Sequence, residues 1–266
     1  MDSGLVYATV GGTALRLDLH RAPDADAPVV LYVHGGGWRG GDRADAATTR
    51  LAPLAGFGVT VASVDYRLVP EARFPDQLHD LKAAVRWLRA RGPELGLRTD
   101  RIGVWGASAG AYLGSLLALT PGDAELEGTV GDNPEQSSAV QAVVHWFGQV
   151  DLLASGSRTE VEARLLPFAF EAGLLGVGSA VEAADRARGL SLLGRVSAGA
   201  PPFLLAHGDR DHVVAPSESQ ALHDALSRAG ADTTLMLLGG AGHEGPEFER
   251  PAMLALTAAW LRATLA

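Results

Sequence analysis

Short apolar runs that end in loops alternate with amphipathic segments along most of this chain, and this alternation restricts the fold most strongly. Continuous apolar runs are typical of buried strands, and apolar residues three and four apart are typical of helices that cover them. The pattern predicts a mostly parallel sheet with helices on both faces, preceded by an antiparallel hairpin around Gly11-Gly12. Strands are expected within 5–10, 13–21, 28–38, 57–68, 100–108, 139–148, 201–209 and 233–243, and helices within 74–92, 109–119, 217–230 and 250–265.

The domain organisation follows from the length of 266 residues, which suits a single α/β domain, 1–266. Only the stretch 152–195 departs from the alternation, because it is helix-prone, interrupted by glycine and carries several large apolar residues. We interpret it as a lid or cap inserted between two strands. The alternative, that it merely packs on the core, has equal support from the sequence.

Charge and cysteine content exclude several classes of function. The net charge is -9, so nucleic acid and anionic membrane surfaces are not expected as partners. The chain has no cysteine, which excludes disulfides, thiolate metal sites and a cysteine nucleophile. The first residues lack the pattern of a signal peptide, so a cytoplasmic location is expected, and a homodimer is compatible with the sequence. No cofactor motif and no metal motif are recognised, so neither group is expected.

Ser108 lies where a predicted strand meets a predicted helix, within the sequence "GVWGASAG". Gly106 and Gly110 flank it in a Gly-x-Ser-x-Gly pattern, which in this context predicts a nucleophile elbow. So sharp a turn leaves no room for side chains two residues before and after the serine. The predicted result is a hydroxyl raised above the carboxyl edge of the sheet.

A serine hydroxyl needs a base, and the base needs an acid that orients it. His243 is the candidate base, because among eight histidines it alone lies on a glycine-rich loop after a late strand. Asp209 and Asp211 compete as the acid, and the other would be a turn carboxylate. We choose Asp211, because the apolar pair Val213-Val214 after it would anchor the loop beneath the histidine.

The "HGGGW" stretch, His34 to Trp38, follows a predicted buried strand. Acyl transfer places negative charge on a carbonyl oxygen, and fixed backbone N–H groups must meet that charge. Glycine lets the backbone approach closely, so we predict an oxyanion hole formed by the N–H groups of Gly36, Gly37 and Ala109.

Four motifs in this order resemble the carboxylesterases of the α/β-hydrolase family, over nearly the whole chain. They are "HGGGW", "DYRLVPEARFP", "GASAG" and "HGDRDHVV". The resemblance implies the α/β-hydrolase fold, with Ser108 as nucleophile, Asp211 as acid and His243 as base. It also implies oxyanion donors at Gly36, Gly37 and Ala109. The short segment before "HGGGW" favours the bacterial feruloyl-esterase-like branch, or the kynurenine-formamidase-like group, over the hormone-sensitive-lipase-like branch.

The predicted function is hydrolysis of small carboxylic esters, with short or aryl acyl groups, through an acyl-enzyme intermediate. Three alternatives stay open: an arylformamidase or amidase with the same triad, a metal-dependent hydrolase and a non-catalytic binding protein. The metal alternative rests on "HGDRDH", with potential ligands at His207, Asp209, Asp211 and His212. Aromatic side chains are candidates for lining the substrate pocket, and these are Trp38, Tyr112, Trp146, Phe147, Phe168 and Phe170.

Overall fold

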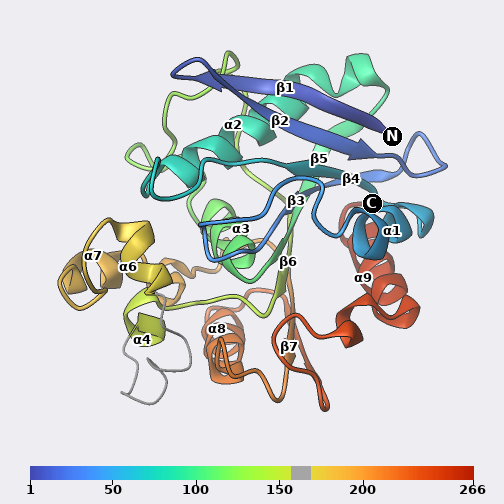
Figure 1. The fold of residues 1–266 in the computed structure, drawn as a ribbon. Helices are drawn as coiled ribbons and strands as arrows, with labels where there is room; N and C mark the ends of the chain where they lie inside the picture. The colour runs from blue at the N-terminus through green and yellow to red at the C-terminus, as the bar shows by residue number, and fades with distance from the viewer. Residues whose placement is uncertain (157–168) are drawn as a thin grey trace.

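One eight-stranded sheet forms the centre of the computed structural model, which describes residues 1–156 and 169–266 (Figure 1). The strand order is β1-β2-β4-β3-β5-β6-β7-β8. β1 pairs with β2 and β2 with β4 in antiparallel fashion, and the remaining pairs are parallel. The strands are β1 Asp2–Val10, β2 Thr13–His20, β3 Pro28–Val33, β4 Thr60–Val64, β5 Arg98–Ala107, β6 Ala142–Trp146, β7 Phe203–Gly208 and β8 Thr233–Leu238. The predicted fold class and hairpin are confirmed.

Helices cover both faces of this sheet (Figure 1). α1 and α9 share one buried cluster with the sheet, whereas α2, α3 and α8 share the other. The helices are α1 Ala52–Gly56, α2 Asp76–Arg91, α3 Ala109–Leu119, α4 Leu152–Gly156, α6 Phe170–Leu175, α7 Ala184–Gly189, α8 Pro216–Arg228 and α9 Pro251–Thr264. Short turns of other helix types are η1 Ala47–Leu51, η2 Pro93–Leu95, η3 Leu192–Arg195 and η4 Pro246–Glu249. None of the described helices is long and apolar enough to cross a membrane.

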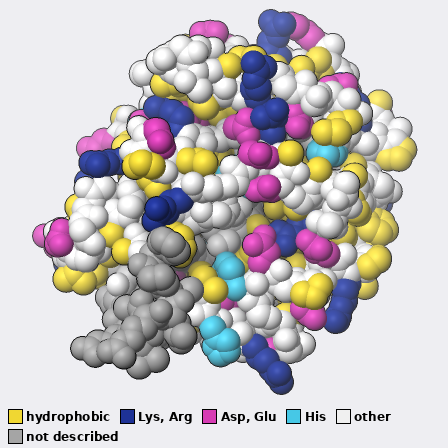
Figure 2. Space-filling view, viewed as in Figure 1, with side chains coloured by type: hydrophobic (Ala, Val, Ile, Leu, Met, Phe, Trp, Pro, Cys, Tyr) yellow, Lys and Arg dark blue, Asp and Glu magenta, His cyan; other side chains and the backbone are white. Residues whose placement is uncertain are grey.

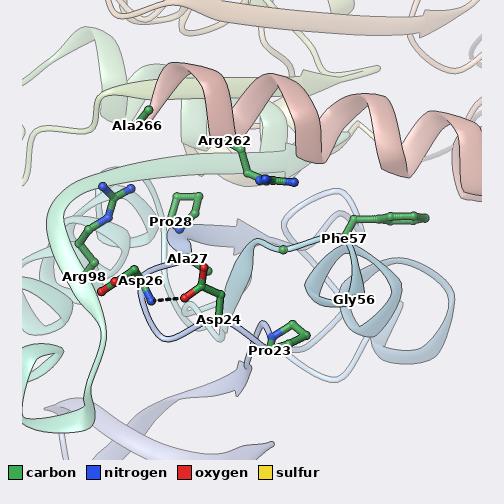
Figure 3. Close-up of a pocket in the computed structure, with 11 residues that line it drawn as sticks. Pro23, Asp24, Asp26, Ala27, Pro28, Gly56, Phe57, Arg98, Arg262 and Ala266 are labelled. Carbon is green, nitrogen blue, oxygen red and sulfur yellow. Dashed lines mark hydrogen bonds between the residues drawn. The ribbon is translucent and has the colours of Figure 1, made fainter.

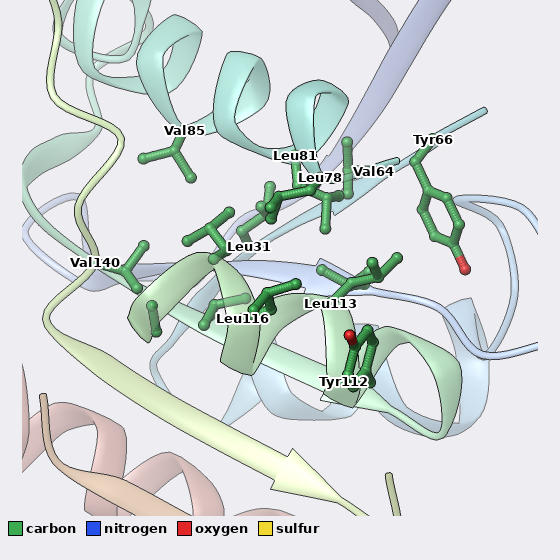
Figure 4. Packing of buried hydrophobic residues seen from close by; sticks show 14 of the residues in the cluster. Leu31, Val64, Tyr66, Leu78, Leu81, Val85, Tyr112, Leu113, Leu116 and Val140 are labelled. Atoms are coloured by element: carbon green, nitrogen blue, oxygen red, sulfur yellow. The ribbon is translucent and has the colours of Figure 1, made fainter. Parts of the chain in front are cut away.

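The helical face of α2 shows why this segment folds as predicted. Leu78, Leu81 and Val85 follow each other at helical spacing and are all fully buried. They pack towards α3, where Leu113 and Leu116 are also fully buried (Figure 4). Burial of side chains of this size stabilises a fold by about 1.5–3 kcal/mol each before the cost of ordering the chain.

The parallel strands bring distant loops to one edge of the sheet. The carboxyl ends of neighbouring parallel strands face the same way, and open α/β sheets bind ligands at that edge. β3 ends at Val33, β5 at Ala107, β7 at Gly208 and β8 at Leu238. The loops that carry the candidate site residues therefore begin side by side.

The predicted insertion lies between β6 and β7, where the described part comprises α4, α6, α7 and η3. Residues 157–168 lie outside the described residues, so the lid interpretation of 152–195 stays a prediction. The elements η1 and α1 were not predicted, because residues 47–56 carry few large apolar residues and no clear helical period.

Candidate active site

Ser108 lies at the turn between β5 and α3, with φ 53° and ψ −123°. A non-glycine residue with positive φ is uncommon and marks a backbone that its surroundings hold in place. Here the Ser108 N–H donates to the Trp146 carbonyl of the neighbouring strand at 2.9 Å. The side chain is nearly buried, with 7% of the residue exposed.

The two flanking glycines have the steric role that the sequence suggested. A Cβ atom on Gly106 would overlap the backbone of Gly110 and Ala111. A Cβ atom on Gly110 would overlap the carbonyl oxygens of Val33 and His34. In both cases the overlapping atoms belong to the backbone, so they cannot move away by rotation of a side chain. The elbow therefore brings α3 close against the end of β3 as well as raising Ser108.

His243 joins Ser108 to Asp211 across long stretches of sequence. Its Nε2 lies 2.9 Å from Ser108 Oγ, and its Nδ1 lies 2.7 Å from Asp211 Oδ2. In the tautomer that suits both contacts, Nδ1–H donates to the carboxylate and Nε2 accepts the serine proton. The structure thus brings together the three side chains chosen for the triad.

Asp211 is held by backbone groups as well as by histidines. Its Oδ1 accepts the N–H groups of Val213 and Val214 at 2.8 and 2.9 Å. Burial alone would raise the pKa of Asp211, but hydrogen bonds from His207 and His243 outweigh it, and the pKa falls well below the ordinary value. The carboxylate is therefore ionised at neutral pH, as an acid that orients an imidazole must be.

The loop after β7 places the two aspartates in different surroundings, with Asp211 beside His243. Asp209 accepts the Gly240 N–H at 2.6 Å and is the turn carboxylate. The reason given for choosing Asp211 is correct only in part, because Val214 is buried whereas Val213 is 38% exposed. The backbone amides of these valines, rather than two apolar side chains, fix the carboxylate.

The oxyanion loop lies beside the nucleophile. Gly36 and Gly37 have φ of +98° and +61°, and a Cβ atom on Gly35 would lie 3.3 Å from Ser108 Cβ. Trp38 Nε1 donates to the Ala109 carbonyl at 3.1 Å and so ties this loop to the start of α3. Within the part of the chain that the structure describes, the N–H groups of Gly36, Gly37 and Ala109 have no acceptor. They are available to a ligand.

Most of the aromatic pocket candidates have to be corrected. Trp38, Tyr112, Trp146 and Phe147 are fully buried in the core, because each packs against other large side chains. Among the described residues, none of these four lines the hollow beside the oxyanion loop or the one at the opposite edge of the sheet. Phe170 is half-buried, and its ring lies against Gly37, where a Cβ atom would overlap it. Phe168 lies outside the described residues.

The cluster "HGDRDH" does not form a metal-ligand set. His207 is buried, with Nδ1 2.7 Å from Ser219 Oγ and Nε2 3.0 Å from the Val214 carbonyl. Both ring nitrogens are therefore occupied by the protein. Among the residues that the structure describes, no three histidine or acidic side chains gather as ligands of one ion.

Two hollows lie at opposite edges of the sheet. One, of about 590 Å³, is lined by Pro28 and Arg98 at the starts of two strands and by Arg262 of α9, so it is remote from Ser108 (Figure 3). The other, of about 430 Å³, is lined by the oxyanion loop, Arg50 and Glu244. Figure 2 shows acidic and basic side chains gathered near histidines on one face of the molecule.

Comparison with protein families gives a match to the BD-FAE model over residues 17–226. That range covers most of the chain and includes Ser108 and Asp211. The chain belongs to the BD-FAE family. His243 lies beyond the matched range, so its place beside Ser108 is evidence independent of the match.

Curated relatives of this BD-FAE chain are esterases. It is 33% identical over 223 residues to Esterase LipC of Mycobacterium tuberculosis, which covers 83% of this chain and 54% of the relative. It is 32% identical over 231 residues to the probable carboxylic ester hydrolase LipM of the same organism, at 85% and 51% coverage. The chain thus spans about half the length of these relatives.

Solved structures extend the likeness over nearly the whole chain. A truncated carbohydrate esterase from gut microbiota superposes with a TM-score of 0.87 at 27% identity, covering 98% of this chain and 95% of its own. Propionate-bound esterase Est2 of Thermogutta terrifontis gives 0.77 at 26% identity, with 96% and 92% coverage. The fold of this BD-FAE chain is therefore the α/β-hydrolase fold of esterases.

Proposed function

We propose that this chain hydrolyses carboxylic esters with Ser108 as the nucleophile. The single observation that carries the proposal is the continuous set of contacts from Asp211 through His243 to Ser108, at 2.7 and 2.9 Å. Three side chains from three loops have no structural need to align in this order. The arrangement is the one that turns a serine hydroxyl into a nucleophile.

The reaction proceeds in two steps. His243 takes the hydroxyl proton as Ser108 Oγ attacks the ester carbonyl, and the resulting imidazolium returns that proton to the leaving alcohol. Water then attacks the acyl-enzyme with His243 again as base, and the acid is released. Asp211 keeps the imidazole in the required tautomer and stabilises its charged form.

Gly36, Gly37 and Ala109 would stabilise the oxyanion in both steps. Their N–H groups have no acceptor within the described residues, Ala109 directly follows Ser108, and a Cβ atom on the neighbouring Gly35 would lie 3.3 Å from Ser108 Cβ. Ala109 also begins α3, so the positive end of a helix of 11 residues faces the developing charge. Donors that are fixed beforehand need no reorganisation during the reaction.

A short or aryl acyl group is the proposed substrate preference. The Phe170 ring lies against Gly37 of the oxyanion loop, where a Cβ atom would overlap it, and we propose that this ring limits the length of the acyl group. Phe170 belongs to the segment 152–195, which we propose to act as a cap within the single domain. The propionate bound to the similar Est2 agrees in size with this preference.

Amide hydrolysis by the same triad is the alternative, and a pair of matched substrates separates the two. We expect a higher kcat/KM for an aryl formate than for the corresponding aryl formamide, because the aryloxide leaves without needing full protonation. The measurement is initial rates for both substrates with wild-type protein and with Ser108→Ala as blank. Faster turnover of the formamide would assign the site to amides, and turnover of neither would contradict a hydrolase.

A further inference from the structure

A buried arginine lies behind the loop that carries His243. Arg50, at the end of η1, is 2% exposed although it bears a permanent charge. Its guanidinium contacts two carboxylates, Glu244 Oε1 at 3.1 Å and Glu249 Oε1 at 3.2 Å. Buried charges of this kind are retained only when partners surround them. Both partners belong to the segment that links His243 to α9.

Glu244 is the residue directly after His243, and its backbone is in the left-handed region with φ 56°. Such a conformation is unfavourable for a residue with a side chain and needs an external contact to persist. The described contacts of the Glu244 side chain are with Arg50. The ion pair therefore acts on the backbone immediately beside the imidazole.

Arg50 also reaches the imidazole through an aromatic ring. Its guanidinium lies 5.9 Å from the centre of the Trp146 ring and 6.0 Å from that of Phe147, within the range of cation–π contacts. The Phe147 ring in turn meets the His243 ring edge to face, with centres 5.0 Å apart. Glu244, the neighbour of His243 in sequence, and the Phe147 ring thus both support the position of the imidazole.

We propose that Arg50 is a positioning residue that holds His243 at hydrogen-bond distance from Ser108. The inference rests on the proposed function, since it concerns the geometry of the same triad. Arg50 does not touch the reacting atoms, and it acts through Glu244 and Phe147. Arginine suits this place because its planar fork pairs with two carboxylates and lies flat against rings at once.

The test compares kcat of Arg50→Met with that of wild type. The concentration of active sites is measured by titration with a fluorophosphonate, so that unfolded protein is not counted in kcat. We expect kcat to fall by about 10- to 100-fold, since a displacement of about 1 Å at a catalytic group costs this much. KM should stay close to the wild-type value, because substrate contacts are unchanged. Arg50→Lys should recover part of kcat, because it restores a charge without the fork.

A double-mutant cycle and a matched control separate positioning from stability. Glu244→Gln should lower kcat, and the double variant with Arg50→Met should be hardly slower than Arg50→Met alone, because both changes break one contact. Arg86→Met is the control, since Arg86 is also buried, with 4% exposed, and pairs with Glu127 rather than with the His243 loop. It should lose stability but keep kcat per titrated site.

Two results would overturn the proposal: wild-type kcat per titrated site in Arg50→Met, or an equal fall in Arg86→Met. Independent effects of Arg50 and Glu244 in the cycle would also count against it. A failure of the proposed function shows up differently, since wild-type protein would then neither turn over esters nor react with the fluorophosphonate. The experiment therefore separates the two claims.

Discussion

Replacing Ser108 with alanine is expected to lower kcat for an aryl acetate by about 10⁴- to 10⁶-fold. In the proposed mechanism the substitution removes the atom that forms the acyl-enzyme, while the proposed oxyanion donors stay in place. KM should therefore change far less than kcat. The measurement is steady-state kinetics on the folded variant, with thermal unfolding as a check that the elbow is intact.

Ser115→Ala is the matched control for this variant. Ser115 lies on the same helix, α3, is fully buried, and bonds to His145 rather than to the triad at 2.8 Å. We expect it to reduce stability and to leave kcat within a few-fold of wild type. Comparable activity of Ser108→Ala and wild type would show that another residue is the nucleophile.

Replacing His243 with alanine is expected to cost nearly as much as replacing Ser108. Without the imidazole, the hydroxyl keeps its proton at neutral pH and the leaving alcohol receives none. Because the two residues act as one unit, the double variant should be no slower than either single variant. The measurement is kcat for all three variants with the same aryl acetate.

His223→Ala controls for a general effect of losing a histidine. His223 lies on α8 and contacts Thr233 at 3.1 Å, so its loss should leave kcat close to wild type. If the losses from Ser108 and His243 simply multiplied in the double variant, the two residues would be acting independently. A shared proton transfer would then be the wrong mechanism.

The elbow was predictable from sequence because its constraints are local. A strand, two glycines and a helix follow each other within residues 98–119, and the steric obstacles that exclude side chains at Gly106 and Gly110 are backbone atoms. The alternation of apolar runs and helices likewise predicted the sheet. These features depend on periodicity and turn chemistry, which a single sequence contains.

Contacts between distant segments were harder to predict. Arg50 and Glu244 are 194 residues apart, and nothing near Arg50 in the sequence marks it as buried. The preference for Asp211 over Asp209 was argued from two valine side chains, although the backbone amides hold it. Which partner a polar side chain meets depends on how loops cross, and a single sequence does not contain that information.

The aromatic candidates illustrate a second limit. Trp38 and Trp146 are of a residue type that often lines pockets, yet both are fully buried. Large aromatic rings pack in cores as readily as they line binding sites, because burial of their apolar surface is favourable in both environments. Phe170 differs in being half-buried and in lying against Gly37, and both features depend on the tertiary structure.

Reaction with a fluorophosphonate, followed by mass mapping of the adduct, tests the central claim most directly. The reagent phosphonylates a serine only where a base takes its proton and fluoride leaves, so the reaction reports the assembled triad. We expect one phosphonyl group per chain, on the peptide that contains Ser108, and none in His243→Ala. An adduct on another residue, or no adduct on the folded wild-type protein, would contradict the account.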